Sequence, residues 1–483
     1  MTGRIALIRA DASVSIGTGH IRRCLTLAHV LRREGWTCRF VVGVESSAVV
    51  PELDGSPFEI RVLTPRANHD AHSLEAHTDG GCDLLIVDHY GLDRIYEKAC
   101  RRFARRILVL DDLPGRIHDA DILVDPTPGR TAAMRTDHVP TASIRLVGPS
   151  YAPLRPELVA MRFSDRKAPA TPRLLVSFGG TDPDNATGRF LAALAAKPLN
   201  GWAVDIMLGR GARHVADVME AVERASGDIR LHLDSPDVAA LLVNADLAVG
   251  AGGVSALERC CIGLPAVILV LADNQRDPAA AVSDVGAASL ASNVEAAVVA
   301  VHMLARDAEK RARMAAAATA LCDGRGAQRI ALRLDPPLAK DGRPVWLRPA
   351  TMGDAETMLQ WQRQPETRRH ARVTEAPDEV THRAWLGAHL TNPDCLLNLV
   401  MHDEEPAGVL RLDRKGEKGW EVSILIDAAR HGHGVGTAAL AAARRLVPEA
   451  SLLAEVLPEN VASHALFLSA GYRRTNGWYE ARP

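Results

Sequence analysis

Short apolar runs alternate with helical patterns over residues 4–321, and this alternation is the feature that most constrains the fold. Alternating strands and helices form parallel sheets that helices cover on both faces. A Pro-containing segment, Pro149–Pro156, separates two sets of runs. We therefore predict two doubly wound, Rossmann-like α/β domains that bind ligands at the carboxyl ends of their strands. The predicted strands are Arg4–Arg9, Cys38–Val42, Asp83–Asp88, Ile107–Asp111, Arg173–Ser177, Val204–Leu208, Ile229–Leu233, Leu247–Gly250 and Ala266–Val270.

The composition changes at Asp335–Pro344, a Pro-rich and charged stretch that is typical of a linker. We predict an N-terminal domain at 1–155, a second domain at 156–335, a linker at 336–344 and a C-terminal α+β domain at 345–483. Ala-rich Val294–Leu321 predicts one long helix or a pair of helices. In the last domain we expect helices near Asp354–Gln364 and after Gly436, and strands at Leu396–His402, Ala407–Asp413 and Glu421–Asp427.

The charge balance argues against a nucleic-acid-binding protein. Lys plus Arg number 57 and Asp plus Glu number 59, and aromatic residues make up only 4%. A polyanion binder carries a basic excess, and a single-strand binder needs aromatic stacking platforms. The eight cysteines form no CxxC pair, and no apolar run reaches the roughly 18 residues of a membrane helix. We expect a reduced cytoplasmic protein that does not bind membranes.

No metal is expected from the sequence. His69, His72 and His77 lie in a polar segment without HExxH spacing, which is typical of a solvated loop. No acidic cluster suggests a metal site either, and Ser177 and Ser255 do not stand in GxSxG elbows, which disfavours a serine hydrolase.

A first candidate site is the turn Gly17-Thr18-Gly19-His20, which lies between a predicted strand and a predicted helix. Glycines let the backbone turn tightly, and free N–H groups at a helix start hold anions. His20 falls on the first helical turn, where the helix dipole disfavours the imidazolium and keeps a neutral base available. The alternative is a plain strand-to-helix turn with a solvent-exposed histidine.

A second candidate site begins where another predicted strand ends. Bare backbone at Gly252 and Gly253 suits a diphosphate at the start of the helix that follows, and Glu258 lies about one and a half turns later, within reach of a ribose. The alternative is that the glycines serve close packing and Glu258 faces solvent. The predicted binding residues are Gly252, Gly253, Val254, Ser255, Glu258 and, after the next strand, Asn274 and Gln275.

Taken together, these motifs resemble the UDP-2,4-diacetamido-2,4,6-trideoxy-β-L-altropyranose hydrolases of pseudaminic acid biosynthesis, a GT-B-like family related to spore-coat polysaccharide proteins. The resemblance covers about residues 4–333. It is carried, in family order, by Arg9–Ser13, Ile16–His20, Arg23–Ala28, Asp88–Gly91, Leu110–Asp112, Tyr151–Arg155, Ser177–Asp182, Gly250–Glu258 and Ala272–Gln275.

The resemblance implies removal of UDP by attack of water at the anomeric carbon, with inversion. It implies that His20 is the general base and that Tyr90, also predicted as catalytic, lies beside the substrate. It further implies that Arg155, Glu258 and Asn274 line the substrate site, with Gly17, Thr18 and Gly19 forming the turn that carries the base.

The C-terminal domain resembles the GNAT N-acetyltransferases. A predicted strand runs into a glycine loop and then a helix, as in the loop of that family whose amides hold the pyrophosphate of acetyl-CoA. Asn460-x-x-Ser463-x-x-Leu466-Phe467 and Leu347–Ala350 match further parts of the family pattern. The resemblance implies acetyl-CoA as acetyl donor, bound by His431, Gly432, His433, Gly434, Val435, Gly436 and Asn460.

Two positions depart from the GNAT pattern. His431 replaces the first Arg or Gln of the loop, and Phe467 stands where many members have a Tyr that protonates the departing thiolate. The sequence does not choose among Tyr472, His464 and Ser463 for that role. Glu421 is a candidate base for the substrate ammonium, or else a solvated edge residue.

We therefore predict a bifunctional enzyme of nonulosonic acid biosynthesis. The C-terminal domain would acetylate the 4-amino group of a UDP-4-amino sugar, and the first two domains would hydrolyse UDP from the product. Two alternatives stay open: a UDP-sugar glycosyltransferase that uses the same site, and a hydrolase joined to an acetyl-CoA-binding domain without catalytic activity.

Overall fold

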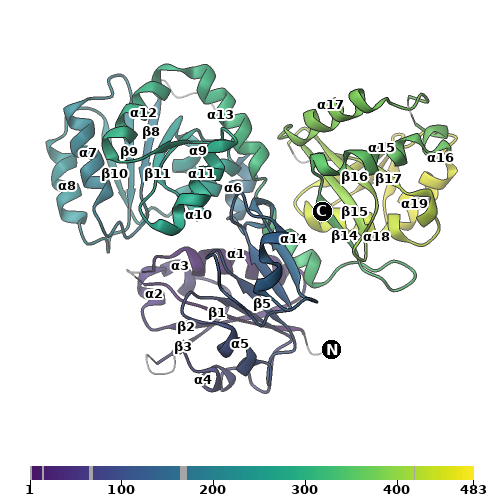
Figure 1. Cartoon of the computed structure of the whole chain (residues 1–483), viewed down its shortest axis with the longest axis horizontal. Coiled ribbons are helices and arrows are strands. Elements are labelled where there is room, and N and C mark those ends of the chain that lie inside the picture. The colour runs from purple at the N-terminus through teal and green to yellow at the C-terminus, as the bar shows by residue number, and fades with distance from the viewer. Residues whose placement is uncertain (1–2, 14–15, 65–68, 164–170, 372, 418) are drawn as a thin grey trace. The chain divides into compact units, whose positions relative to one another are not determined.

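The apolar runs of residues 5–147 pair as a seven-stranded parallel sheet with the order β3-β2-β1-β4-β5-β6-β7. Figure 1 labels β1, β2, β3 and β5 of this sheet. Every residue of β4, β5 and β6 is buried, as expected for parallel strands that helices cover on both faces. The sequence patterns do not predict β3, β6 and β7. The strands are β1 (Ile5–Ala10), β2 (Thr37–Gly43), β3 (Glu59–Leu63), β4 (Leu84–Asp88), β5 (Ile107–Leu110), β6 (Ile122–Asp125) and β7 (Ile144–Val147).

Short helices connect these strands. The longest, α1, carries nine buried residues on its inner face. The helices are α1 (Gly19–Arg33), α2 (Ser46–Val49), α3 (Pro51–Asp54), α4 (Ala71–Glu75), α5 (Arg94–Cys100), η2 (Ala132–His138), η3 (Pro149–Tyr151) and α6 (Pro156–Met161).

A second parallel sheet follows, with six strands in the order β10-β9-β8-β11-β12-β13. The strands are β8 (Arg173–Ser177), β9 (Ala203–Leu208), β10 (Ile229–Leu233), β11 (Leu247–Ala251), β12 (Ala266–Leu269) and β13 (Ser289–Ala291). The helices are α7 (Ala186–Ala196), α8 (Val215–Arg224), α9 (Val238–Asn244), α10 (Val254–Cys261), η4 (Asp273–Gln275), α11 (Arg276–Asp284), α12 (Val294–Arg306) and α13 (Ala308–Leu321).

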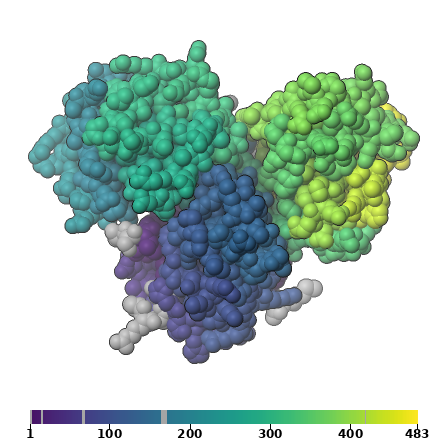
Figure 2. All heavy atoms as spheres, in the orientation of Figure 1, coloured from purple at the N-terminus to yellow at the C-terminus, as the bar shows by residue number. Residues whose placement is uncertain are grey.

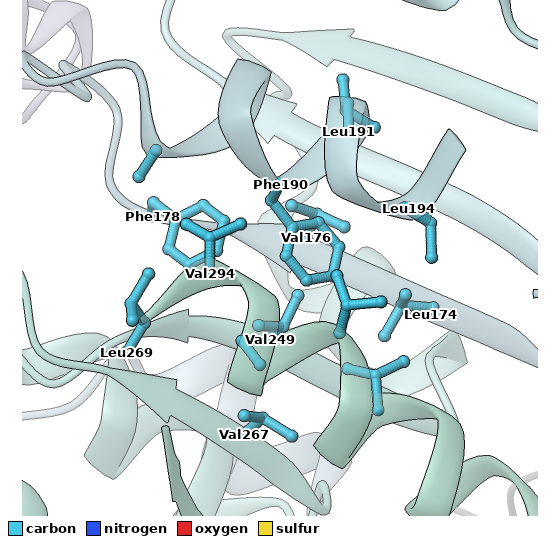
Figure 3. Close-up of a cluster of buried hydrophobic side chains, with 14 of the residues drawn as sticks. Leu174, Val176, Phe178, Phe190, Leu191, Leu194, Val249, Val267, Leu269 and Val294 are labelled. Atoms are coloured by element: carbon cyan, nitrogen blue, oxygen red, sulfur yellow. The ribbon is translucent and has the colours of Figure 1, made fainter. Parts of the chain in front are cut away.

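The core of the second sheet is built from strand and helix side chains that interleave (Figure 3). Phe190 of α7 packs over Val176 and Val249, while Val294 brings in α12. The Ala-rich stretch forms a pair of helices rather than one, because the Asp307 carboxylate accepts the Lys310 N–H and starts α13.

The strand order of both sheets reverses in the middle. The chain proceeds from β1 to β2 on one side and returns to β4 on the other, and it does the same from β8 to β9 and back to β11. Loops diverge above such a reversal and leave a crevice at the carboxyl ends, where α/β proteins bind ligands. Two Rossmann-like domains in succession are the predicted GT-B-like architecture, and this prediction is confirmed.

The C-terminal sheet is mixed, with the order β14-β15-β16-β17-β18-β20-β19. All its pairs are antiparallel except β17 with β18. Its strands are β14 (Val345–Pro349), β15 (Cys395–His402), β16 (Glu405–Lys415), β17 (Gly419–Ile426), β18 (Ser451–Glu455), β19 (Arg473–Thr475) and β20 (Trp478–Ala481). The helices are α14 (Gly326–Leu334), η5 (Met352–Asp354), α15 (Ala355–Arg363), α16 (Pro365–Arg369), α17 (Glu379–Leu390), η6 (Ala428–Arg430), α18 (Val435–Leu446) and α19 (Val461–Ser469).

This computed structural model describes residues 3–13, 16–64, 69–163, 171–371, 373–417 and 419–483, which are coloured along the chain in Figure 2. The chain divides into two compact units, Met1–Ala327 and Gln328–Pro483. The segment predicted as a linker belongs to the second unit: Leu338 bridges Pro344, and Arg445 donates to the carbonyl of Asp335. The domain boundaries at 155 and 345 stay predictions. No helix within the described ranges is both long and apolar enough to cross a bilayer.

A buried ion cluster fixes the loop after β5. His118 is 2% exposed, and its ring nitrogens lie 2.6 Å from Glu97 and 2.9 Å from Asp111. Burial alone would lower the pKa of His118, but hydrogen bonds to the two carboxylates outweigh it and raise the pKa to about 9. His118 is therefore a buried imidazolium that donates to both partners.

This cluster predicts a loss of stability at alkaline pH. The His118 contribution is complete below the unfolded pKa of about 6.5 and is lost as the pH rises through the folded value of about 9. Between pH 7 and 9.5, wild type should lose about 2 kcal/mol more of its unfolding free energy than His118→Gln. Urea denaturation at both pH values measures this difference, and parallel curves for the two proteins would contradict the assignment.

Candidate functional site

His20 lies at the strand reversal of the first sheet. Gly17 adopts φ +80° and turns the chain into α1, which places His20 on the first helical turn. The imidazole is 5% exposed, and its Nδ1 lies 2.5 Å from Oδ1 of Asp88, the last residue of β4. His20 is therefore a buried and oriented side chain, not the solvent-exposed histidine of a plain turn.

Asp88 decides which ring nitrogen carries the proton. Arg23 donates Nε and Nη2 to the two Asp88 oxygens at 2.6 Å each. Burial opposes ionisation of Asp88, but Arg23 and His20 together hold its pKa well below its usual range. An ionised carboxylate only accepts, so Nδ1 of His20 donates to it and Nε2 keeps the free lone pair. No hydrogen bond to Nε2 is formed by the described residues.

Tyr90 stands beside this pair. Its ring meets the His20 ring edge-on at 4.4 Å between centroids, and its hydroxyl donates to Asp112 at 2.8 Å. The other Asp112 oxygen accepts from Arg23 at 2.9 Å. Burial and the Asp112 charge raise the pKa of Tyr90, so the side chain is a neutral phenol. It orients its neighbours and does not serve as a base in this state.

Sequence reasoning placed Asp88 and Arg23 in motifs without giving them a role. Asp11 was similarly unassigned: it accepts from Arg9, from the Gly43 N–H and from His89, which precedes Tyr90. One feature of the sequence could have indicated that carboxylates gather here. The predicted strands Asp83–Asp88 and Ile107–Asp111 each end in an aspartate, and the ends of neighbouring parallel strands meet at one edge of a sheet.

The second site lies at the strand reversal of the second sheet. Gly250 pairs with Ser177 in the ladder of β11 and β8, and α10 begins at Val254 with Gly253 as N-cap and no side-chain cap. The first N–H groups of α10 therefore have no side-chain acceptor at the cap. A Cβ at Gly179, Gly180 or Gly253 would meet no atom within 4 Å, so a ligand can approach this backbone closely.

Arg155 and Glu258 are brought together across 103 residues of sequence. Arg155 donates Nε to the Glu258 carboxylate at 3.0 Å, and Glu258 is 9% exposed. The segment Ala152–Val159 packs against α10 in one apolar cluster, which positions Arg155. Glu258 therefore does not lie on a solvated face.

Asn274 and Gln275, which were both predicted to bind the substrate, differ in exposure and contacts. Asn274 is exposed in η4. Gln275 turns its carboxamide oxygen to the backbone and accepts from Gly252 at 3.3 Å and from Leu271 at 3.2 Å. Gln275 thus fixes the backbone of the glycine turn. The sequence predicted it only as a substrate-binding residue and did not indicate this contact.

In the second unit, β17 and β18 pair only where Gly419–Glu421 face Ser451–Leu453, and β17 then continues to Ile426. The loop that follows turns through Gly432 and Gly434, with φ +80° and +82°, into α18. Lys340 donates its N–H to His433 O and its Nζ to Gly432 O, and no side chain caps the start of α18. Lys340 lies in the segment predicted as a linker.

Residues 345–473 match the acetyltransferase (GNAT) domain family. This match confirms the C-terminal part of the resemblance. It covers only the last part of the chain.

Three curated relatives cover other parts. An uncharacterized protein of Methanocaldococcus jannaschii is 26% identical over 281 residues, 57% of this chain and 57% of that protein, so the chain spans little more than half of that relative. The Bacillus subtilis spore coat polysaccharide biosynthesis protein SpsG is 25% identical over 285 residues, 58% of this chain and 81% of its own length.

The third relative is the UDP-2,4-diacetamido-2,4,6-trideoxy-β-L-altropyranose hydrolase of Campylobacter jejuni, 25% identical over 237 residues, 49% of this chain and 80% of its own length. The predicted resemblance to this hydrolase and to spore-coat proteins is confirmed. Among solved structures, a calicheamicin glycosyltransferase aligns with 70% of this chain and 100% of its own at 17% identity and a TM-score of 0.47.

Within the GNAT domain, Glu421 lies at the last paired position before β17 and β18 diverge, and Lys415 contacts its carboxylate at 3.0 Å. Asn460 caps α19 by accepting the Ser463 N–H at 3.0 Å. His431 is exposed, and its Nε2 lies 3.0 Å from the Ile426 carbonyl. The predicted cofactor residues therefore lie in the exposed loop His431–Gly434, in the first turn of α18, where Val435 is buried, and at the cap of α19.

Phe467 is buried among aromatic rings. Tyr472 meets it edge-on at 5.1 Å, and Tyr479 stacks on it at 5.6 Å. The Tyr479 hydroxyl lies 2.8 Å from Nδ1 of His464. Sequence reasoning considered Tyr472 and His464 but missed Tyr479, because only the pairing of β20 with β18 brings it to α19.

The glycines of the second site predict a contrast in stability. A Cβ at Gly250 would lie 2.2 Å from the Ser177 carbonyl oxygen, a backbone atom that cannot move away cheaply. Gly250→Ala should therefore lower the free energy of unfolding by roughly 1–3 kcal/mol, whereas Gly253→Ala should change it by less than about 0.5 kcal/mol. Urea denaturation compares the two variants, and equal stabilities would contradict the close approach of β8 and β11.

Proposed function

We propose that the chain is a bifunctional enzyme of pseudaminic-type sugar biosynthesis. Its first unit hydrolyses UDP from UDP-2,4-diacetamido-2,4,6-trideoxy-β-L-altropyranose, and its GNAT domain N-acetylates the 4-amino group of the UDP-4-amino-sugar precursor with acetyl-CoA. The observation that carries the hydrolase proposal is the buried His20–Asp88 pair at 2.5 Å, which leaves Nε2 as a base at the edge of the sheet. The likeness to the Campylobacter jejuni hydrolase supports it.

In the hydrolytic step, Nε2 of His20 takes a proton from water while the water oxygen bonds to the anomeric carbon. The bond from that carbon to the UDP oxygen breaks on the opposite face, which inverts the configuration. Asp88 stabilises the imidazolium that forms, and Arg23 keeps Asp88 ionised. Tyr90 packs against the imidazole and fixes its plane.

The leaving UDP occupies the second site in this proposal. The N–H groups at the start of α10, which no side chain caps, take the diphosphate, and a helix N-terminus offers such charge stabilisation without a metal. Glu258, oriented by Arg155, accepts from the ribose hydroxyls. Among the described residues no group of three or more His, Cys, Asp or Glu side chains is placed to hold a metal ion.

The acetyl transfer uses the divergence of β17 and β18. The residues fit acetyl-CoA: a Cβ at Gly432 would meet no atom within 4 Å, and the start of α18 has no side-chain cap, so its N–H groups can take a pyrophosphate. The substrate amine bonds to the thioester carbonyl carbon, and the carbon–sulfur bond breaks. Glu421 takes the ammonium proton before the attack, directly or through water, and CoA departs as the thiolate, which takes the second proton lost by the amine nitrogen.

Acetylation precedes hydrolysis in this scheme, because the hydrolase acts on the diacetamido sugar.

All eight cysteines are free and buried, which fits a protein of the reducing cytoplasm.

A test of the hydrolase uses the UDP-sugar without any acceptor. Wild type should release UDP and free sugar in equal amounts, whereas a glycosyltransferase would require an acceptor. His20→Gln should lower kcat by roughly 10²–10⁴ with UDP affinity unchanged, because only proton transfer is lost. His72→Gln is the matched control, since that histidine is 81% exposed. Normal turnover by His20→Gln would reject His20 as the base.

A test of acetyl-CoA binding replaces two glycines for which the change to alanine should strain the backbone to a similar extent. Gly432 and Gly416 have φ +80° and +68°, and neither would place a Cβ within 4 Å of another atom. Gly432→Ala should weaken acetyl-CoA binding about tenfold by distorting the loop, while Gly416→Ala, in the turn between β16 and β17, should not. Calorimetry on the full chain measures both, and equal affinities would remove the loop from the binding site.

A further inference from the structure

Arg259 is a buried cation at the strand reversal of the second sheet. It lies on α10 and is 2% exposed. Its Nη2 donates to the Ala251 carbonyl at 2.7 Å, and its Nη1 lies 2.9 Å from the position of a Cβ on Gly250. The guanidinium therefore lies directly against the turn that joins β11 to α10.

The charge of Arg259 has no carboxylate partner among the described residues. Within the described part of the chain, its one hydrogen bond goes to the Ala251 carbonyl, and its buried Nε has no partner. The neighbouring Glu258 is engaged by Arg155. Burial lowers the pKa of Arg259, with Cys260 and Glu258 opposing the shift, yet a guanidinium stays charged at neutral pH. An uncompensated buried charge is unfavourable, which indicates that its counter-ion comes from outside the chain.

The peptide group between Ala251 and Gly252 is held at both ends. Arg259 binds its carbonyl at 2.7 Å, and Gln275 accepts its N–H at 3.3 Å. This clamp fixes the direction of the turn, and the cap at Gly253 leaves the next N–H groups without a side-chain acceptor. The positive charge beside the turn and the helix start without a side-chain cap favour the same kind of ligand, an anion at Gly252–Val254.

We propose that Arg259 is a positioning residue whose buried charge makes this turn selective for the diphosphate of a nucleotide over the bare nucleoside. The proposal rests on the proposed UDP site. Arg259 acts through the peptide that it clamps and through its field, not by direct contact. When the bond between the anomeric carbon and the UDP oxygen breaks, negative charge grows on the departing diphosphate, and the fixed cation stabilises that charge.

Calorimetry with UDP and with uridine on the full chain tests this inference. Arg259→Met should weaken UDP binding by about 10- to 100-fold and uridine binding by less than about threefold, because only UDP carries the charge that the guanidinium attracts. Arg259→Lys keeps the charge and should retain most of the UDP preference. Arg162→Met is the control, since Arg162 donates to the carbonyls of Cys261, Thr319 and Cys322 in the same domain and should leave the preference unchanged.

Thermal unfolding gives a second, independent measure. Removing an unpaired buried charge should leave the ligand-free Arg259→Met protein as stable as wild type or more stable, while the rise in Tm on adding UDP should be smaller. If Arg259→Met does not fold, Arg259→Gln takes its place in both measurements.

The outcomes separate the two proposals. Equal losses of UDP and uridine affinity, or no loss of either, would overturn the role of Arg259 while the UDP site stands. Wild-type protein that binds neither ligand would overturn the proposed UDP site, and the role of Arg259 with it.

Discussion

A carboxylate with no exposed surface, Asp88, organises the first site. A buried carboxylate remains ionised only where donors replace water, and here Arg23 and His20 from one helix supply them. The interaction ties α1 to β4 across the strand reversal and fixes the imidazole in one tautomer. The position of the candidate base at this edge of the sheet thus follows from the need to compensate the buried charge of Asp88.

In the second sheet, the buried charge at the strand reversal is positive. Arg259 is a buried cation with no carboxylate partner among the residues that the structure describes, and the turn beside it contains glycines and a helix start without a side-chain cap. In the proposed reaction, the first site supplies a base and the second receives an anion. Both arise where the strand order reverses, because loops diverge there and leave backbone groups unpaired.

In the GNAT domain, the candidate site lies where two neighbouring strands separate, not at a reversal of strand order. The antiparallel ladder is interrupted by one parallel pair, β17 with β18, and those strands separate after Glu421. Lys340 reaches the loop that follows from a segment whose composition suggested only a linker. Phe467 is packed by Tyr472 and Tyr479, so its side chain serves the core, and the polar groups near it are those of Tyr479 and His464.

The sequence by itself determined the strands β1, β2, β4, β5, β8–β12 and β15–β17, the helix starts that follow glycine turns, and the three loops that carry candidate sites. Those features are local, because apolar periodicity and glycine positions act over a few residues. The strands β6 and β7 were not predicted, although β5 and β12, which were predicted, have the same length of four residues. Only the tertiary structure decided which polar groups meet: Asp88 with His20, Arg155 with Glu258, Gln275 with Gly252. Those contacts join residues 23 to 103 positions apart, and the order of strands in the sheet, not their spacing in the chain, brings them together.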